Sequence, residues 1–272
     1  MPLLRIDDLQ SPILDPYRNL RTTNLTRFSG RFIAESRPLV LRLLDSSIDV
    51  ESVLLDEAFL EEALPRIPEQ VNTLVVPSEM VSELIGFNFH RGYLACGLRP
   101  KPGTVEDFLR DHSLPTVPSN STRWTGAMLV GVQDPENLGS ILRSCAALGI
   151  VDIFMGPQCV DPFARRVLRV SMGNAFKLRF YDSKDVLADL ERLNALRIES
   201  IAACLADDSQ ELTGFSRNGN ALILFGNEAH GLPLSVQQTC TRRLKIAMDL
   251  ETDSLNVSVA AGIILHNLCR IC

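Results

Sequence analysis

The sequence predicts an α/β protein with two domains, the larger of them at the carboxyl end. Its 272 residues suit two domains of about 100–150 residues each. Short apolar stretches alternate with helical patterns over most of the chain, and a proline-rich break separates two such regions. We therefore expect an extension at 1–20, a small α/β domain at 21–100, a linker at 101–122 and a larger α/β domain at 123–272.

The amino-terminal region combines a proline-containing extension with a compact alternation of strands and helices. Apolar positions between Phe32 and Leu44 fit a helical stretch that follows Ser29. Ser78 is a suitable N-cap for a later helix, since its hydroxyl can accept a bond from a free backbone N–H. In chain order, we expect a helical stretch within 29–44, a strand at 52–55, a helix at 57–64, a strand at 72–76, a helix at 79–85 and a strand at 93–98.

The carboxyl-terminal region repeats this alternation more strongly. Its strand candidates are short and apolar throughout, which is typical of strands that are buried on both faces. Helical stretches separate most of them, so the sequence predicts a mostly parallel sheet with helices on both sides. The expected strands are 127–132, 151–155, 200–205, 221–225 and 244–248.

Charge limits the partners of the chain. The formal net charge is −6, and most of it lies before residue 123, where 12 Lys and Arg face 17 Asp and Glu. A nucleic-acid site must therefore be a local patch of cations. The residues that could form such a patch can instead be solvated surface charges or parts of the packed core. The candidate cations are Arg18, Arg21, Arg27, Arg31, Arg165, Arg166, Arg169, Arg242, Arg243 and Lys245. Phe87, Phe89, His90, Arg91 and Tyr93 form a stretch that could stack on bases.

The cysteines and the amino terminus indicate the compartment. Seven cysteines contain no CxxC pair and no metal-ligand spacing, so we expect no metal site. An odd number of cysteines without a secretory signal indicates a reducing compartment. The chain starts with acids where a targeting peptide would be basic, and no apolar run approaches the length of a membrane span. We therefore expect a soluble, cytoplasmic protein with no membrane partner.

The first of three candidate site segments is 132–149, which we interpret as a strand end, a turn at Asp134 and a helix from about Asn137. Asn137 and Arg143 are six positions apart, which places them about 240° apart around an ideal helix. The two side chains converge only if Asn137 precedes the regular helix. The alternative is that Asn137 caps the helix and Arg143 is a solvated surface residue.

The second segment is 222–233, in which an apolar strand runs into a loop bracketed by glycines, a common ligand site in open α/β sheets. Gly226 and Gly231 allow close backbone approach, and Glu228 between them is placed to form a hydrogen bond. The loop is not GxGxxG, so it does not indicate a dinucleotide site. His230 has no His or Cys at ligand spacing, which favours a hydrogen-bonding role over metal binding.

The third segment is 244–266 and contains a strand, an acidic turn and a helix of small and apolar residues. Ser254 is a candidate N-cap for this helix, and the small residues at 260–262 allow another helix to pack closely. The alternative is a capped, buried helix without a functional role.

Taken in order, the segments carry N-x-G-x-x-x-R at 137–143, G-x-E-x-x-G-L at 226–232 and S-L-N-V-S-V-A-A-G at 254–262. Together they resemble the SpoU (TrmH) family of S-adenosylmethionine-dependent RNA 2′-O-methyltransferases, in the SPOUT superfamily. The resemblance covers about 123–272, and 30–99 is similar to the small substrate-binding domain that often precedes this catalytic domain. It implies an α/β fold with a deep trefoil knot, which periodicity alone would not predict. It also implies a homodimer whose active site is completed across the interface.

The resemblance further implies roles for individual residues. Arg143 activates the ribose 2′-hydroxyl, and Asn137 orients groups beside it. Because arginine keeps its proton at neutral pH, we expect Arg143 to steer a phosphate and to orient the hydroxyl. The third motif departs from the family at Ala247, where the family commonly has proline. Glu228, Ser254 and Asn256 complete the catalytic set, and the cofactor S-adenosylmethionine would contact Gly226, Asn227, Gly231, Ile246, Met248 and Leu255.

These motifs predict an enzyme that methylates a ribose 2′-hydroxyl in structured RNA. Ribosomal RNA is the preferred substrate, because the small domain resembles that branch of the family. Transfer RNA is the alternative substrate, and a non-catalytic RNA-binding relative of the same fold is the alternative function. An oxidoreductase of doubly wound fold is disfavoured, because GxGxxG is missing.

Overall fold

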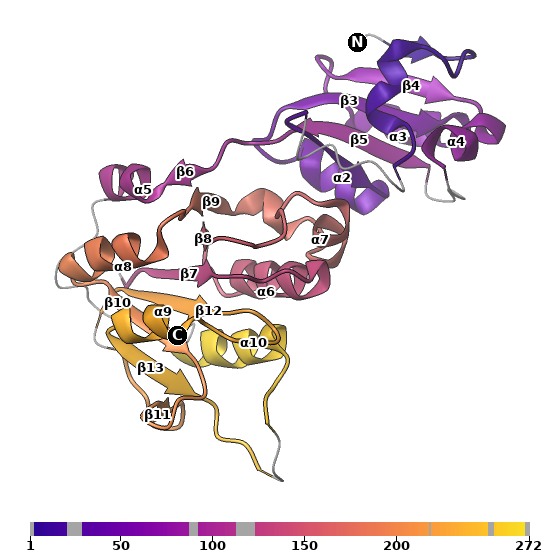
Figure 1. Cartoon of the computed structure of the whole chain (residues 1–272). Helices are drawn as coiled ribbons and strands as arrows, with labels where there is room; N and C mark the ends of the chain where they lie inside the picture. Colours follow the sequence, from indigo (N-terminus) through magenta and orange to yellow (C-terminus); the bar gives the residue numbers. More distant parts are fainter. Residues whose placement is uncertain are drawn as a thin grey trace. The chain divides into compact units, whose positions relative to one another are not determined.

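The computed structural model describes residues 3–20, 29–86, 92–112, 123–217, 219–249 and 253–269. Contacts between Cα atoms divide the chain into two compact units (Figure 1). Unit 1 contains Met1–Lys101 and Asp161–Phe176, and unit 2 contains Pro102–Val160 and Lys177–Cys272. A short segment from the carboxyl-terminal half of the chain therefore belongs to unit 1.

Unit 1 is built on a five-stranded sheet in the order β1-β4-β3-β5-β2. β1, β4 and β3 are parallel, and β5 runs antiparallel to both β3 and β2. The strands are β1 (Leu3–Arg5), β2 (Arg31–Glu35), β3 (Val50–Asp56), β4 (Asn72–Val76) and β5 (Tyr93–Leu98). The helices are η1 (Pro12–Tyr17), α2 (Arg37–Leu44), η2 (Glu57–Phe59), α3 (Leu60–Ala63), η3 (Leu64–Arg66), α4 (Ser78–Ile85) and α7 (Arg165–Val170).

The helical stretch predicted within 29–44 is wrong in its first part, which forms strand β2. Consecutive residues of a strand point to opposite faces, and Phe32 and Ile33 are both buried because both faces of β2 are covered. Phe32 packs on Phe163, with ring centroids 5.0 Å apart. Helix α2 follows the strand and has Pro38 in its first turn, where a helix needs no backbone N–H.

The interpretation of Ser78 as an N-cap is also wrong. Ser78 is the first residue of α4, and Pro77 precedes it as the N-cap. The Ser78 hydroxyl donates to the carboxylate of Asp56 instead, which ties the start of α4 to the end of β3.

The segment predicted as an amino-terminal extension packs into unit 1 through Tyr17, which is fully buried. The Tyr17 hydroxyl donates to the carbonyl of Ser52 at 3.0 Å and accepts from the N–H of Cys96 at 3.1 Å. This hydroxyl therefore connects η1 to β3 and β5.

Tyr17→Phe should lower the free energy of unfolding by about 1–3 kcal/mol, because two buried backbone groups lose their partner. Urea denaturation measures the change. Tyr93→Phe is the matched control, since the buried Tyr93 hydroxyl has no hydrogen-bond partner among the described residues. Equal destabilisation by both variants would contradict the role of the Tyr17 hydroxyl.

Unit 2 is built on an eight-stranded sheet in the order β11-β13-β10-β12-β7-β8-β9-β6, in which every neighbouring pair is parallel. The predicted parallel sheet is confirmed, while the trefoil knot stays a prediction. β13 lies between β10 and β11 although it follows both in the chain. The strands are β6 (Gly103–Thr104), β7 (Thr125–Leu129), β8 (Asp152–Met155), β9 (Arg179–Asp182), β10 (Glu199–Ala203), β11 (Gln210–Glu211), β12 (Ala221–Phe225) and β13 (Arg242–Lys245).

Helices pack on both faces of this sheet (Figure 1). Met128, Leu222 and Leu224 belong to a buried cluster with side chains of α5, α8 and α9. Ile223 and Phe225 alternate with them and are buried on the opposite face, and α10 contacts both β12 and α6. The helices are α5 (Val105–Asp111), α6 (Pro135–Ala147), α8 (Val186–Ala195), α9 (Leu234–Thr239) and α10 (Val257–Leu268), and η5 (Asn174–Lys177) joins the two units in sequence.

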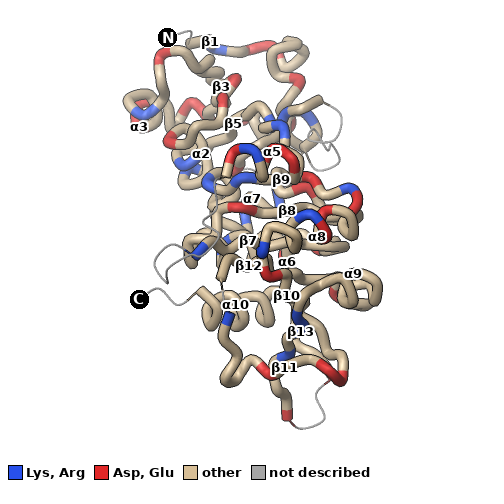
Figure 2. The backbone as a smooth tube through the Cα atoms, turned by 90° about the vertical axis from the view of Figure 1, so that its left-hand side faces the viewer, with Lys and Arg blue, Asp and Glu red and all other residues tan. Residues whose placement is uncertain are grey.

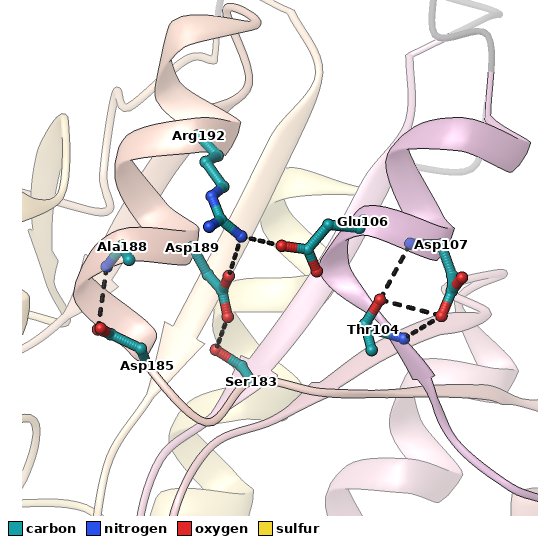
Figure 3. A network of polar contacts seen from close by, with 8 residues as sticks. All are labelled: Thr104, Glu106, Asp107, Ser183, Asp185, Ala188, Asp189 and Arg192. Atoms are coloured by element: carbon teal, nitrogen blue, oxygen red, sulfur yellow. Dashed lines mark hydrogen bonds and ion pairs between the residues drawn. The ribbon is translucent and has the colours of Figure 1, made fainter.

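Part of the segment predicted as a linker is folded into unit 2 as β6 and α5. Thr104 caps α5, since its hydroxyl accepts from the N–H of Asp107 at 3.1 Å while the Asp107 carboxylate accepts from the N–H of Thr104 at 2.8 Å. Figure 3 shows how Arg192 of α8 reaches Glu106 of α5 and lies 3.5 Å from Asp189. These contacts hold α5 against α8.

Candidate active site

The first site segment starts helix α6 earlier than predicted. Asp134 is the N-cap, because its carboxylate accepts from the N–H of Glu136 at 2.6 Å and from that of Asn137 at 3.1 Å. Pro135 occupies the first turn, which suits a residue without a backbone N–H. Asn137 therefore lies inside the helix, so a capping role for Asn137 and a position before the helix are both wrong.

Arg143 lies further along α6 and is exposed to solvent. Because Asn137 is also helical, the rotation of about 240° between the two positions leaves their side chains on different faces of the helix. Among the described residues, Arg143 has no hydrogen bond or ion pair and does not join the contacts of Asn137. The convergence of Arg143 and Asn137 within one chain, which the sequence left open, does not occur.

The second site segment is a tight loop that follows β12. Backbone hydrogen bonds in both directions between Asn227 and Gly231 close it, at 3.1 and 2.9 Å. A Cβ on Gly226 would overlap the backbone of Gly231, so only glycine fits at this position. Asn227 Nδ2 donates to the carbonyl of Gly131 at 2.8 Å, which ties the loop to the turn after β7.

Three side chains connect the three site segments directly. The Glu228 carboxylate accepts from Asn137 Nδ2 at 3.1 Å and from the N–H of Asp134 at 3.2 Å. Asn137 Oδ1 in turn accepts from Asn256 Nδ2 at 2.9 Å. Asn256 is the N-cap of α10, where its Oδ1 accepts from the N–H of Ser258 at 2.9 Å. The structure thus brings Glu228, Asn137 and Asn256 into one chain of hydrogen bonds.

A cavity of about 450 Å³ is lined by residues that follow β10, β12 and β13 and by α10. Its volume suits a small-molecule ligand. Glu228 and Ser254 line it, although Ser254 is not the N-cap that the sequence predicts, since Asn256 has that role. All six residues that were expected to contact a cofactor also line this cavity, namely Gly226, Asn227, Gly231, Ile246, Met248 and Leu255.

Part of the cavity wall was missed by the sequence reasoning. Ala203, Cys204 and Leu205 come at the end of β10, and Ala260 and Ile264 of α10 complete the wall. The signal was present in the sequence, because the carboxyl ends of neighbouring parallel strands meet at one edge of a sheet.

A second cavity, of about 1050 Å³, shares the loop 227–231 with the first. Asn137 lines this larger cavity, and Glu228 lines both. Ligands in the two cavities would therefore meet at the same loop. The other polar residues that line the larger cavity include Gln133, Asp134, Gln158, Lys184 and His230.

The three site segments match a known family. A model of the SpoU rRNA methylase family covers residues 126–266, more than half of the chain. The chain belongs to the SpoU rRNA methylase family. A protein from Mycobacterium bovis that is described as an uncharacterized tRNA/rRNA methyltransferase is 29% identical over 97% of this chain and 90% of its own. The SpoU-type chain is also 28% identical to the 23S rRNA (guanosine-2′-O-)-methyltransferase RlmB from Acinetobacter baylyi, over 71% of this chain and 75% of RlmB.

Solved structures share the fold of this SpoU-family chain. An rRNA methyltransferase from Sinorhizobium meliloti, solved with AdoMet bound, has a TM-score of 0.79 at 22% identity and covers 97% of both chains. AviRb, a SpoU methyltransferase from Streptomyces viridochromogenes, has a TM-score of 0.74 at 22% identity, over 95% of this chain and 96% of its own. The predicted SpoU-type α/β fold is confirmed. By family, the chain is an RNA methyltransferase, as its motifs predict.

Many of the arginines expected to face RNA are paired inside their own unit. Figure 2 shows positive and negative residues interspersed along both units. Tyr93 is buried against Phe59, so core packing accounts for this aromatic residue. The ion pairs are Arg18–Asp15, Arg31–Glu51, Arg165–Glu35, Arg242–Glu199 and Arg243–Asp208. Arg21, Arg27, Phe87, Phe89, His90 and Arg91 lie outside the described residues.

The described cysteines are free thiols. Burial raises the pKa of Cys96 and of Cys240 to about 12 and that of Cys159 to about 11, so these thiols are protonated and unreactive at neutral pH. In the described part of the chain, no group of three His, Cys, Asp or Glu side chains is placed to hold a metal ion. Within the same residues, no helix combines the length and apolarity that crossing a membrane requires.

Asn256→Asp separates the two contacts of Asn256. Aspartate keeps an oxygen that caps α10 but has no N–H to donate to Asn137. We expect stability within about 0.5 kcal/mol of wild type, and methyl transfer slower by roughly 10- to 100-fold, because Asn137 is less well oriented. Asn256→Ala should lose the cap as well, at a further cost of about 1 kcal/mol. Urea denaturation and transfer rates measure both effects, and an Asp variant with wild-type activity would contradict the prediction.

Proposed function

We propose that this protein transfers a methyl group from S-adenosylmethionine to a ribose 2′-hydroxyl of ribosomal RNA. The observation that carries the proposal is the Glu228–Asn137–Asn256 chain of hydrogen bonds, which lies where two cavities share a wall. The smaller cavity suits a cofactor and the larger one a nucleotide, so the reacting groups would meet beside Glu228. The related RlmB enzyme is named for this reaction on 23S rRNA, which supports the choice of substrate.

The smaller cavity suits S-adenosylmethionine in its chemistry. Gly226 and the closed loop after it present backbone groups that can hydrogen-bond an adenine edge. Leu255 and Ile264 offer apolar surface to the base and ribose, and Lys245 offers a cation to the carboxylate of the methionine part. The Sinorhizobium meliloti enzyme, which has the same fold, was solved with AdoMet bound, and this supports the assignment.

The residues at the shared wall can align and deprotonate the ribose hydroxyl. When bound, the cofactor supplies a methyl group on a sulfonium, so the carbon–sulfur bond breaks as the oxygen–carbon bond forms. Positioning the hydroxyl in line contributes much of the rate. Glu228 lines both cavities, and in this proposal its carboxylate accepts the hydroxyl proton. Asn137 is bonded at both ends of its amide and holds this carboxylate in place.

We further propose a homodimer that forms through α6 and α10. Val259 and Ile263 lie four positions apart on α10 and are 51% and 41% exposed, so they form an apolar stripe. A second copy that covers this stripe would bring its own Arg143 to the site, where the guanidinium steers a phosphate and orients the hydroxyl.

Val259→Glu with Ile263→Glu should give a monomer in light scattering. A double variant that stays dimeric would rule out this interface.

The RNA class and the compartment complete the proposal. Ribosomal RNA is favoured by the RlmB relatives, and transfer RNA is the second candidate because the Mycobacterium bovis relative is named for both. A cytoplasmic location is supported by the free thiols, which a reducing compartment maintains.

Two measurements test the proposed reaction. In calorimetry, S-adenosylmethionine should bind the full chain and NAD should not. With a tritium-labelled methyl donor, label should enter unmodified ribosomal RNA transcripts and map to a ribose oxygen. Label in transfer RNA alone would replace the substrate with the second candidate. Cofactor binding without transfer to either RNA class would overturn the reaction.

A further inference from the structure

Unit 1 contains a hollow of about 360 Å³ that the proposed reaction does not use, formed by the start of α2 and the end of α7. Three of the residues that line it are arginines, namely Arg37, Arg42 and Arg169. The remaining wall is small or apolar and consists of Ser36, Pro38, Leu39 and Met172. The hollow therefore combines an apolar floor with a local group of cations.

The positive charge of this hollow is only partly neutralised. Arg37 forms an ion pair with Glu62 at 2.5 Å. The Arg42 guanidinium donates to the carbonyl of Met172, a neutral acceptor. Neither Arg42 nor Arg169 has an ion pair with any carboxylate of the described residues. Two cations thus stay available here, in contrast to the paired arginines of β2 and β13.

The wall of the hollow is tightly built. Ser36 has a φ of 98° and Met172 a φ of 54°, conformations that side-chain-bearing residues rarely adopt and that cluster at ligand sites. A Cβ on Gly173 would lie 2.8 Å from Leu39 Cδ1, so the segment that follows α7 fits closely against α2. The contacts of Met172 and Gly173, which follow α7, with Arg42 and Leu39 of α2 therefore bring Arg42 and Arg169 to one site, although they are far apart in the sequence.

We propose that this hollow binds a phosphodiester of the RNA substrate away from the methylated nucleotide. The inference rests on the proposed function, to which it adds a second RNA contact in unit 1. Arginine binds phosphate oxygens through paired N–H donors, and Pro38 and Leu39 can pack against the attached sugar or base. Phosphate contacts fix the position of a nucleic acid without reading its sequence. The hollow would thus set the position of the RNA on the enzyme.

Arg42→Ala with Arg169→Ala in the full chain tests this site. The KM for a 23S rRNA transcript should rise about 10-fold, and the slope of log affinity against log salt should fall by about 1, as expected for one lost phosphate contact. The kcat and the affinity for S-adenosylmethionine should not change. Arg66→Ala is the matched control, because it removes an exposed arginine of unit 1 that is paired with Asp45.

A conservative variant separates binding from folding. Arg42→Lys with Arg169→Lys keeps both charges, so it should retain most of the salt slope while losing part of the affinity. An alanine variant with the KM and salt slope of the Arg66→Ala control would overturn the proposal. A second result would also overturn it. If wild type bound inorganic phosphate tightly and the alanine variant lost this binding but kept the RNA affinity of wild type, the hollow would be a site for a free anion. The salt slope is taken from equilibrium binding of the RNA, which needs no turnover, so a failure of the proposed reaction would be seen separately.

Discussion

Arg143→Ala should lower the rate of methyl transfer by at least about 100-fold while leaving the fold intact. The side chain is exposed and has no hydrogen bond or ion pair among the described residues, so we expect a stability change within about 0.5 kcal/mol. The rate falls because the hydroxyl and the neighbouring phosphate lose an orienting cation. Single-turnover transfer and thermal unfolding measure the two effects. Arg110→Ala is the control, since it removes an exposed arginine from α5 of the same unit.

The position of Arg143 makes a sharper expectation possible. Arg143 does not reach the Glu228–Asn137–Asn256 chain of its own copy, so the proposed dimer must supply it from the partner. Inactive Arg143→Ala and Glu228→Ala proteins should then complement each other when mixed. One site of each mixed dimer is intact, so random exchange should restore about a quarter of wild-type activity. Absence of rescue would place Arg143 and Glu228 in the same subunit's site, and full activity of Arg143→Ala alone would remove its role.

The sequence predicted the position of the site better than its contacts. A buried strand at 221–225 followed by a glycine-bracketed loop placed the cavity at the carboxyl edge of the sheet, where parallel strands of this kind hold their ligands. The hydrogen bonds that join Glu228, Asn137 and Asn256 span 91 and 119 positions of the chain. No local pattern encodes such a contact, because it depends on how α6 and α10 pack.

Two differences between expectation and structure have different causes. Phe32 and Ile33 lie in a strand because Phe163, from a segment far along the chain, covers one face of β2. Periodicity cannot reveal a cover supplied from so far away. The start of α6, in contrast, could have been predicted from the sequence. Aspartate followed by proline is a signal for a helix N-terminus, and Asp134 with Pro135 provides it.

Gly226→Ala should weaken the binding of S-adenosylmethionine by at least about 100-fold, which corresponds to about 2.7 kcal/mol. A Cβ at this position would overlap the backbone of Gly231 and Leu232, and backbone cannot move aside as the end of a flexible side chain can. The loop would have to open, and the hydrogen bonds between Asn227 and Gly231 would break. Because this loop forms the wall shared by both cavities, its opening displaces the cofactor and Glu228 together.

Gly214→Ala is the control that distinguishes loss of space from loss of backbone freedom. Gly214 has a φ of 80°, yet a Cβ added there would meet no described atom within 4 Å, so alanine at this position is strained but not blocked. We expect this control to lose roughly 1 kcal/mol of stability and to keep its affinity for the cofactor. Calorimetric titration of both variants, at a temperature where each is folded, makes the comparison. If Gly226→Ala bound the cofactor as tightly as Gly214→Ala does, the closed loop would not be the feature that holds it.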